Sequence, residues 1–176
     1  MAKVSKIPTL LELDFSKISN DELRSLRIQI DKECKQRKIK LSAWEIGEEL
    51  AINFFNNTSG FDNLLQTAVG TKNVDALSRK GDRYSIKTIK DGSKSGTIYE
   101  DREEKGKQLF EYLLLVLLDE NYELKSLHRL SWKQFLEVRK WDITMNAWYV
   151  PKTLKALSQG QQLYEKKYIE KKSKND

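Results

Sequence analysis

The chain has 176 residues, of which 39% are hydrophobic and 33% are charged, and its formal net charge is +6. This length and balance are typical of one folded domain, and they exclude a disordered chain or two ordinary domains joined by a linker. With one histidine and one cysteine, the chain cannot build a zinc site of paired His and Cys residues or a framework of internal disulfides.

Further features narrow the class of protein. The longest apolar run, Tyr112–Leu118, is too short to span a bilayer, and the lone Cys34 suits a reducing environment, so we expect a cytoplasmic protein that does not associate with membranes. The sequence contains no glycine-rich phosphate loop of the NTPase or dinucleotide type. Seven Lys and Arg against three Asp between Lys72 and Lys94 favour a polyanionic partner.

Three helices are predicted by one start signal, a serine followed three residues later by Glu or Gln. In this capping box, each side chain satisfies a backbone N–H that the helix leaves free. The signals are Ser19/Glu22, Ser42/Glu45 and Ser131/Gln134, and they predict helices over Asn20–Arg37, Ala43 to about Asn56, and Trp132 to about Lys140.

Between the second and third helices the apolar pattern becomes extended. Short β-type runs at Asn73–Leu77 and Arg83–Ile89 flank a segment whose Gly81 suits a hairpin turn. Phe110–Leu118 is apolar without alternation, as expected of a central strand buried on both faces, and Glu123–Leu130 alternates like a neighbouring strand. The order of elements predicts an α/β fold with a central mixed β-sheet flanked by helices.

We interpret residues 1–164 as a single domain with a helical N-terminal region. The lysine-rich end, residues 165–176, is predicted to be a basic, flexible tail.

Polar residues interrupt the pattern where apolar ones are favoured. Glu48 falls on the apolar face of the second helix, where a carboxylate is costly unless it meets a cation or reaches water. Asp75 stands in the middle of a β-type run, where aspartate is disfavoured. If the hairpin closes as expected, Asp75 projects from the same sheet face as Ser85 and Lys87. Taken singly, Lys87 is a common solvated strand lysine, so the hypothesis of a site depends on the group.

The run Asn73–Leu77, the glycine-containing turn and Tyr84–Thr88 resemble the core motif of the PD-(D/E)XK superfamily of restriction-endonuclease-like nucleases. That motif is an Asp on one strand followed by (Asp/Glu)-x-Lys on the next, and Gly47-Glu48 resembles the helical glutamate that many members carry. The resemblance covers about Ala43 to Ile89 directly. It implies a restriction-endonuclease-like core and a Mg²⁺-dependent endonuclease that hydrolyses DNA phosphodiester bonds.

The resemblance also implies a set of site residues. Asp75, Glu48 and the backbone carbonyl of Ile86 would hold Mg²⁺, for which we expect Mn²⁺ to substitute. Lys87 would orient the attacking water or stabilise charge on the phosphate. Ser85 stands where the family usually has Asp or Glu, and a hydroxyl is a poor ligand for a hard cation. We interpret Glu48 as the replacement carboxylate; without it, the chain would bind DNA and not cut it.

Double-stranded DNA is the partner that the resemblance implies, and cations beside the motif are predicted to neutralise its phosphates. These are Arg79, Lys80, Lys90 and Lys94. Bases are expected to be read by the loop Asp91–Lys105 or by Trp141–Lys155, which includes Asn146.

The compact size suits a type II restriction endonuclease that acts as a homodimer, since cutting a duplex requires two active sites. A DNA repair nuclease or junction resolvase, a nicking subunit of a larger complex, and a basic DNA-binding protein without activity are the alternatives. The motif also has a second possible placement, at Glu123-Leu124-Lys125 with Asp119 upstream.

Overall fold

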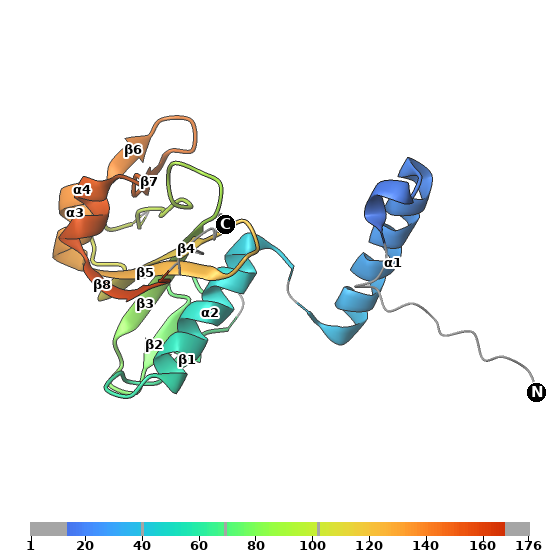
Figure 1. Cartoon of the computed structure of the whole chain (residues 1–176). Helices are drawn as coiled ribbons and strands as arrows, with labels where there is room; N and C mark the ends of the chain where they lie inside the picture. Colours follow the sequence, from blue (N-terminus) through green and yellow to red (C-terminus); the bar gives the residue numbers. More distant parts are fainter. Residues whose placement is uncertain (1–13, 40, 69, 102, 168–176) are drawn as a thin grey trace, which may run out of the picture. The chain divides into compact units, whose positions relative to one another are not determined.

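The computed structural model of the chain describes residues 14–39, 41–68, 70–101 and 103–167 (Figure 1). The chain divides into two compact units, Met1–Leu41 and Ser42–Asp176, which are described separately. Among the residues described, no helix combines the length and the apolar character that crossing a bilayer requires.

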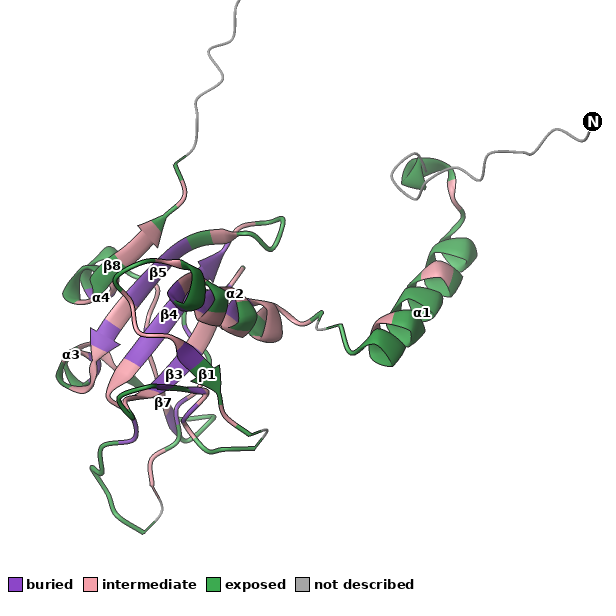
Figure 2. Cartoon of the chain, turned by 90° about the horizontal axis from the view of Figure 1, so that it is seen from below, coloured by how far each residue is buried: buried purple, intermediate pink, exposed green. Residues whose placement is uncertain are grey.

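The N-terminal unit contains a short 3-10 helix, η2 (Phe15–Lys17), and the helix α1 (Asn20–Arg37). α1 starts where the sequence predicts, and Ser19 and Glu22 form both halves of the capping box. None of its residues is buried within the described part of the chain (Figure 2). Ion pairs between residues three or four positions apart lie along its surface, so local interactions account for the helix.

The C-terminal unit is built on a six-stranded sheet with the order β1-β2-β3-β4-β5-β8. β3 and β4 are parallel, and the other neighbouring pairs are antiparallel. The fold is therefore α/β with a mixed central sheet, as predicted. The strands are β1 (Leu64–Gln66), β2 (Ala76–Ser78), β3 (Arg83–Ile89), β4 (Tyr112–Leu118), β5 (Leu124–Ser131) and β8 (Gln161–Glu165), and a separate hairpin consists of β6 (Lys140–Asp142) and β7 (Ala147–Tyr149).

Helices cover both faces of this sheet, and β4 contributes to a core on each side. Leu114 and Val116 pack in one cluster with Phe55 of α2, and Leu113 and Leu115 pack in the other with Phe135 of α3. This two-sided burial explains why β4 is apolar without alternation (Figure 2). The helices are α2 (Ala43–Asn57), α3 (Trp132–Val138) and α4 (Leu154–Gln159), and both predicted capping boxes of this unit are present.

The strand predicted at Asn73–Leu77 is displaced. β2 begins at Ala76, so Asp75 directly precedes the strand and does not stand in its middle. Near the other end, Glu165 closes β8 opposite Ser126, and residues 168–176 of the predicted tail lie outside the described residues.

The connection between the parallel strands β3 and β4 is long, and it is pinned to the β6–β7 hairpin. Ile98 and Trp148 exchange backbone hydrogen bonds of 2.8 and 2.9 Å. The Ser95 N–H donates to the Val150 carbonyl, and the Ser95 hydroxyl accepts from the Val150 N–H. Connections of this length are usually functional or mobile, and these contacts hold the segment in one place.

α2 approaches β3 very closely at Gly47. A Cβ atom on this buried glycine would lie 2.1 Å from Thr88 Oγ1 and 2.6 Å from Thr88 Cγ2. Only the absence of a side chain allows the two elements to meet at this distance. Gly47 therefore sets the height of α2 above the sheet, and with it the position of the next residue, Glu48.

We predict that Gly47→Ala lowers the free energy of unfolding by about 1–3 kcal/mol, because the added methyl forces α2 away from β3. Urea denaturation measures this change. Gly92→Ala is the matched control: its Cβ would meet nothing closer than the Lys94 carbonyl at 3.5 Å, and a change within about 0.5 kcal/mol is expected. Removing the clashing atoms with Thr88→Ala should restore part of the loss in the double variant. Equal stability of Gly47→Ala and the wild type would contradict the close approach.

His128 is buried in β5, and among the described residues its Nδ1 atom has no hydrogen-bond partner. Its Nε2 atom lies 3.2 Å from the Ser126 hydroxyl. Burial lowers the pKa of the His128 imidazole below its ordinary value, and the charge of Glu165 opposes this effect in part. The folded protein therefore holds His128 neutral, whereas the unfolded chain binds a proton near its normal pKa.

Because the His128 pKa is depressed on folding, its contribution to stability is complete above the unfolded pKa of about 6.5 and is lost as the pH falls below it. We expect the free energy of unfolding to decrease between about pH 7.5 and pH 5.5. Chemical denaturation at both pH values should show a smaller decrease for His128→Gln. An unchanged pH dependence in that variant would exclude His128 as the cause.

Candidate active site

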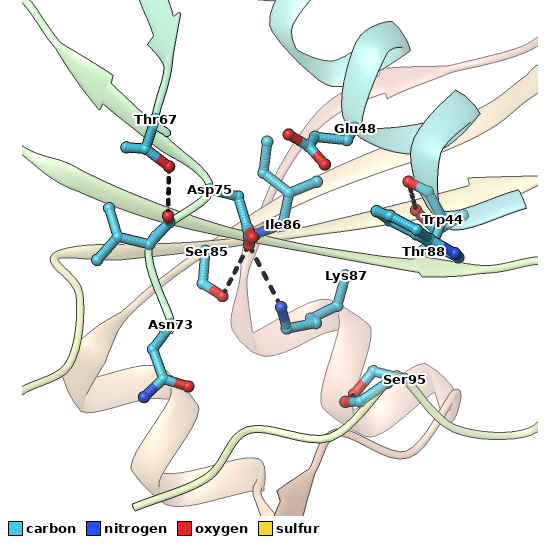
Figure 3. Close-up of polar contacts among 12 residues, drawn as sticks. Trp44, Glu48, Thr67, Asn73, Asp75, Ser85, Ile86, Lys87, Thr88 and Ser95 are labelled. Carbon is cyan, nitrogen blue, oxygen red and sulfur yellow. Dashed lines mark hydrogen bonds and ion pairs between the residues drawn. The ribbon is translucent and has the colours of Figure 1, made fainter. Parts of the chain in front are cut away.

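Asp75 lies at the point where β2 separates from β3. The two strands pair at Ala76↔Tyr84, and the Asp75 N–H donates to the Tyr84 carbonyl over 2.8 Å, after which the ladder ends. Beyond this point the Asp75 side chain takes the place of the missing strand. Its Oδ2 atom accepts hydrogen bonds from the Ile86 N–H at 2.6 Å and from the Ser85 hydroxyl at 3.2 Å (Figure 3).

Strand geometry explains why the Ile86 amide needs this partner. Along β3, the N–H and C=O groups of Tyr84 and Ile86 point to the edge that β2 occupies, because they are two residues apart. At that edge the Tyr84 carbonyl accepts from the Asp75 backbone N–H, and the Ile86 N–H donates to the Asp75 carboxylate. The Ile86 carbonyl shares that edge by the same alternation. An aspartate at this position thus stabilises the end of the ladder, and it leaves a carboxylate and a carbonyl together.

Lys87 completes the group from the face of the sheet opposite α2. Its Nζ atom lies 3.3 Å from Asp75 Oδ2, and the two side chains are only 18% and 26% exposed. The connection after β3 passes over the lysine, since a Cβ on Gly96 would lie 3.6 Å from Lys87 Cδ. Ser85, on the same face, is fully buried. The prediction that Asp75, Ser85 and Lys87 lie together is confirmed.

Glu48 approaches the same edge from the other face. Figure 3 shows its side chain reaching from α2 across Ile86, while Lys87 lies on the far side of β3. Its Oε1 atom accepts a 2.6 Å hydrogen bond from Gln66 Nε2. Gln66 pairs with Ala76, next to Asp75, so this contact places the Glu48 carboxylate over the β1–β2 side of the site. Glu48 and Lys87 therefore reach the edge from opposite faces, with Asp75 between them.

The donor set at this edge suits a hard cation. Within the described residues no group of three or more His, Cys, Asp or Glu side chains could hold a metal ion. The site offers two carboxylates, from Asp75 and Glu48, with the carbonyl of Ile86 on the same edge. Oxygen ligands of this kind are typical of Mg²⁺, which keeps several of its waters when bound.

Four cations are predicted to contact phosphates, and three of them already have carboxylate partners. Lys80 pairs with Asp62 at 2.6 Å and Lys90 with Asp91 at 2.9 Å, and Lys94 pairs with Asp142. Each carboxylate raises the pKa of its lysine above the ordinary value, so the three stay protonated. Arg79 is exposed in the turn between β2 and β3.

The second placement of the motif has a structural explanation. Asp119 Oδ1 accepts from the N–H groups of Asn121 and Glu123 and so stabilises the turn between β4 and β5. Both Asp119 and Glu123 also form ion pairs with Lys166, whereas Lys125 is exposed. The acidic residues of this segment thus meet Lys166 and anchor the strand that precedes the C-terminal end.

Gln66 and Asn73 belong to the surroundings of the site, and sequence reasoning missed both. β1, which carries Gln66, has only three residues and shows no periodic pattern. Asn73 has a φ of 60°, in the left-handed region, and its Nδ2 atom donates to the Tyr99 carbonyl at 3.0 Å. Asparagine is one of the few residues that tolerate this conformation. That preference was the one available signal for a turn before Asp75.

We predict that Asp75→Ala destabilises the protein by about 1–3 kcal/mol, because the nearly buried Ile86 amide loses its acceptor. Asp75→Asn retains an oxygen at that position and should lose clearly less. Guanidinium denaturation of the two variants beside the wild type checks this order. Equal loss in both variants would mean that the charge, and not the hydrogen bond, stabilises the strand edge.

Comparison of the chain with protein-family models and with curated proteins finds no match. The chemistry of the site therefore supplies the functional argument. Its elements are a partly exposed aspartate at the end of the β2–β3 ladder, a largely buried lysine beside it, and a helical glutamate that approaches the same edge.

Proposed function

We propose that the Ser42–Asp176 unit is a Mg²⁺-dependent DNA endonuclease with a restriction-endonuclease-like core, acting as a type II restriction enzyme. The observation that carries this proposal is the grouping of Asp75, Ser85 and Lys87 at a strand edge that Glu48 approaches from α2. Metal-dependent hydrolysis of a phosphodiester uses anionic ligands to hold a divalent ion, and a cation beside them stabilises the charge that develops on the phosphate. This edge supplies both kinds of group.

The residues fit Mg²⁺, and Mn²⁺ in its place. The three donors that contact Asp75 all meet Oδ2, so among the described contacts Oδ1 is the oxygen available to an ion. Asp75 is 26% exposed, which lets a hydrated ion reach it. Glu48 and the Ile86 carbonyl would be the other protein ligands. When bound there, Mg²⁺ would supply Lewis acidity and make a water molecule more acidic.

The protein residues would divide the remaining tasks. Lys87, already held beside Asp75, would hydrogen-bond a phosphate oxygen and stabilise the negative charge that grows on it during attack. The Ser85 hydroxyl would hold Asp75 in one rotamer, which explains how a serine serves at a position where the family has an acid. Gln66 would orient Glu48 in the same way.

Double-stranded DNA is the proposed substrate. Lys80, Lys90 and Lys94 would leave their carboxylate partners and bind DNA phosphates. Because binding of phosphates by lysines releases counterions from the DNA, we expect the affinity to fall strongly with salt. A homodimer would bring two such edges to the two strands. A repair nuclease or junction resolvase would use the same site on branched or damaged DNA.

The rival proposal is a basic DNA-binding protein without catalytic activity. The ion pair between Lys87 and Asp75 favours it, because the same contact stabilises a strand edge without any chemistry. The serine at position 85 favours it as well, because a hydroxyl adds no charge for a metal.

We predict that the purified protein cuts phage and plasmid DNA into discrete fragments only when Mg²⁺ or Mn²⁺ is present. Asp75→Asn and Lys87→Met should each lower the cleavage rate by at least about a hundredfold, since a ligand and a charge-stabilising group are lost. Gel electrophoresis of timed digests gives the rates. DNA binding without cutting by the wild type would favour the rival, and cutting of branched DNA alone would favour a resolvase.

Lys125→Ala is the matched control, because Lys125 is an exposed strand lysine from the second placement of the motif. This variant should cut like the wild type. Loss of cutting in Lys125→Ala together with full activity of Lys87→Met would refute the location of the site.

A further inference from the structure

We propose that the pocket between the β3–β4 connection and the β6–β7 hairpin binds one unpaired nucleotide of the DNA substrate. The inference deepens the proposed function and rests on it. The pocket has a volume of about 980 Å³, within the range of sites that hold a ligand. Its lining includes Lys72, Tyr99, Lys105, Trp141, Met145 and Asn146.

The exposed apolar surface in this pocket suits the flat face of a base. Tyr99, Trp141 and Met145 are 44%, 39% and 47% exposed, which is unusual for such large apolar side chains gathered at one place. Bases stack on aromatic side chains when they are unpaired, whereas in a duplex their faces are covered by neighbouring bases. Stacking residues therefore favour a single-stranded or extruded nucleotide over a paired one.

Two residues that line the pocket, Glu100 and Trp141, are held in place by Trp148. The rings of Trp141 and Trp148 meet edge to face, with their centroids 4.7 Å apart. The Trp148 Nε1–H donates to Glu100 at 2.8 Å, and the Arg139 guanidinium lies 3.8 Å from the Trp148 ring centroid. A wall held in this way loses little conformational entropy when a base stacks on Trp141.

The pocket lining carries two lysines, Lys72 and Lys105, and two carboxylates, Glu100 and Asp101, so it offers groups both for a phosphate and for the donors of a base. Lys72 and Lys105 are exposed and could meet the phosphate, while Asn146, at the tip of the hairpin, offers an amide to a base edge. Asp101 accepts from the N–H groups of Glu103 and Glu104, which lower its carboxyl pKa. The Asp101 carboxylate therefore stays anionic and acts only as a hydrogen-bond acceptor, for example from the amino group of a base.

The pocket is tied directly to the segment that precedes β2 and contains Asp75. Lys72 Nζ donates to the Glu100 carbonyl at 3.3 Å, and Asn73 Nδ2 donates to the Tyr99 carbonyl. Two residues therefore separate the pocket wall from the candidate ligand. A nucleotide in the pocket would belong to the same strand as the phosphate at Asp75, close to the bond that is cut.

Binding is tested in the Asp75→Asn background, which separates binding from cutting. Fluorescence anisotropy compares three oligonucleotides of one sequence: a single strand, a duplex with one bulged 2-aminopurine, and a fully paired duplex. We expect Tyr99→Ala and Trp141→Ala to weaken binding of the first two by about tenfold and of the paired duplex by less than about twofold. The 2-aminopurine emission should be quenched in the parent and brighter in both variants.

The controls separate stacking from folding and from charge. Ile143→Ala removes an apolar side chain that is 88% exposed on the same hairpin and does not line the pocket, so it should bind like the parent. Trp141→Phe keeps an aromatic face and should restore most of the affinity. If only the single strand is affected, the nucleotide comes from a single strand, and an effect on the bulged duplex shows that an extruded base is accepted.

Equal weakening of all three oligonucleotides, or no weakening in either pocket variant, would overturn the inference while leaving cleavage by the wild type unaffected. Failure of the wild type to cut, with the pocket effect intact, would overturn the catalytic proposal alone. Failure of the parent to bind any of the three would overturn both.

Discussion

The hydrogen bond from the Ile86 amide to the Asp75 carboxylate is the interaction on which the site depends. β2 leaves β3 after the Ala76–Tyr84 pair, and a nearly buried backbone N–H without a partner would destabilise the sheet. The carboxylate satisfies that amide and is held in place by it. β2 does not continue past this point. The Oδ1 atom of Asp75 and the carbonyl of Ile86 therefore lie along the same edge of β3. The end of the β2–β3 ladder therefore explains both why an aspartate stabilises the sheet here and why a carboxylate is present at the candidate site.

Two neighbouring elements complete the surroundings of this edge. Gly47 lets α2 lie close to Thr88 of β3. The helix thereby places Glu48 on the face of the sheet opposite Lys87. The long β3–β4 connection covers Lys87 at Gly96 and then joins the β6–β7 hairpin. Each element packs on the sheet for ordinary reasons of burial and pairing. As a result, Glu48 and Lys87 approach the edge from opposite faces, and Asp75 lies between them.

Local signals in the sequence predicted a large part of this arrangement. Capping boxes are interactions within four residues, so three helix starts were predicted correctly, and strand alternation brought Ser85 and Lys87 to one face. Which face of the sheet α2 covers depends on tertiary packing. The sequence therefore could not predict that Glu48 and Lys87 approach β3 from opposite faces. β1 and the β6–β7 hairpin are too short to show a period, and Gln66 was missed with them.

We propose that Asp75 and Glu48, which approach one strand edge from different elements, share a single divalent ion. Binding of Mn²⁺, followed by electron paramagnetic resonance of the free ion, measures this directly, without DNA and without turnover. We expect one site per chain, with the affinity for Mn²⁺ reduced at least about tenfold in both Asp75→Asn and Glu48→Gln. Unchanged affinity in Glu48→Gln, or no binding by the wild type, would contradict this proposal.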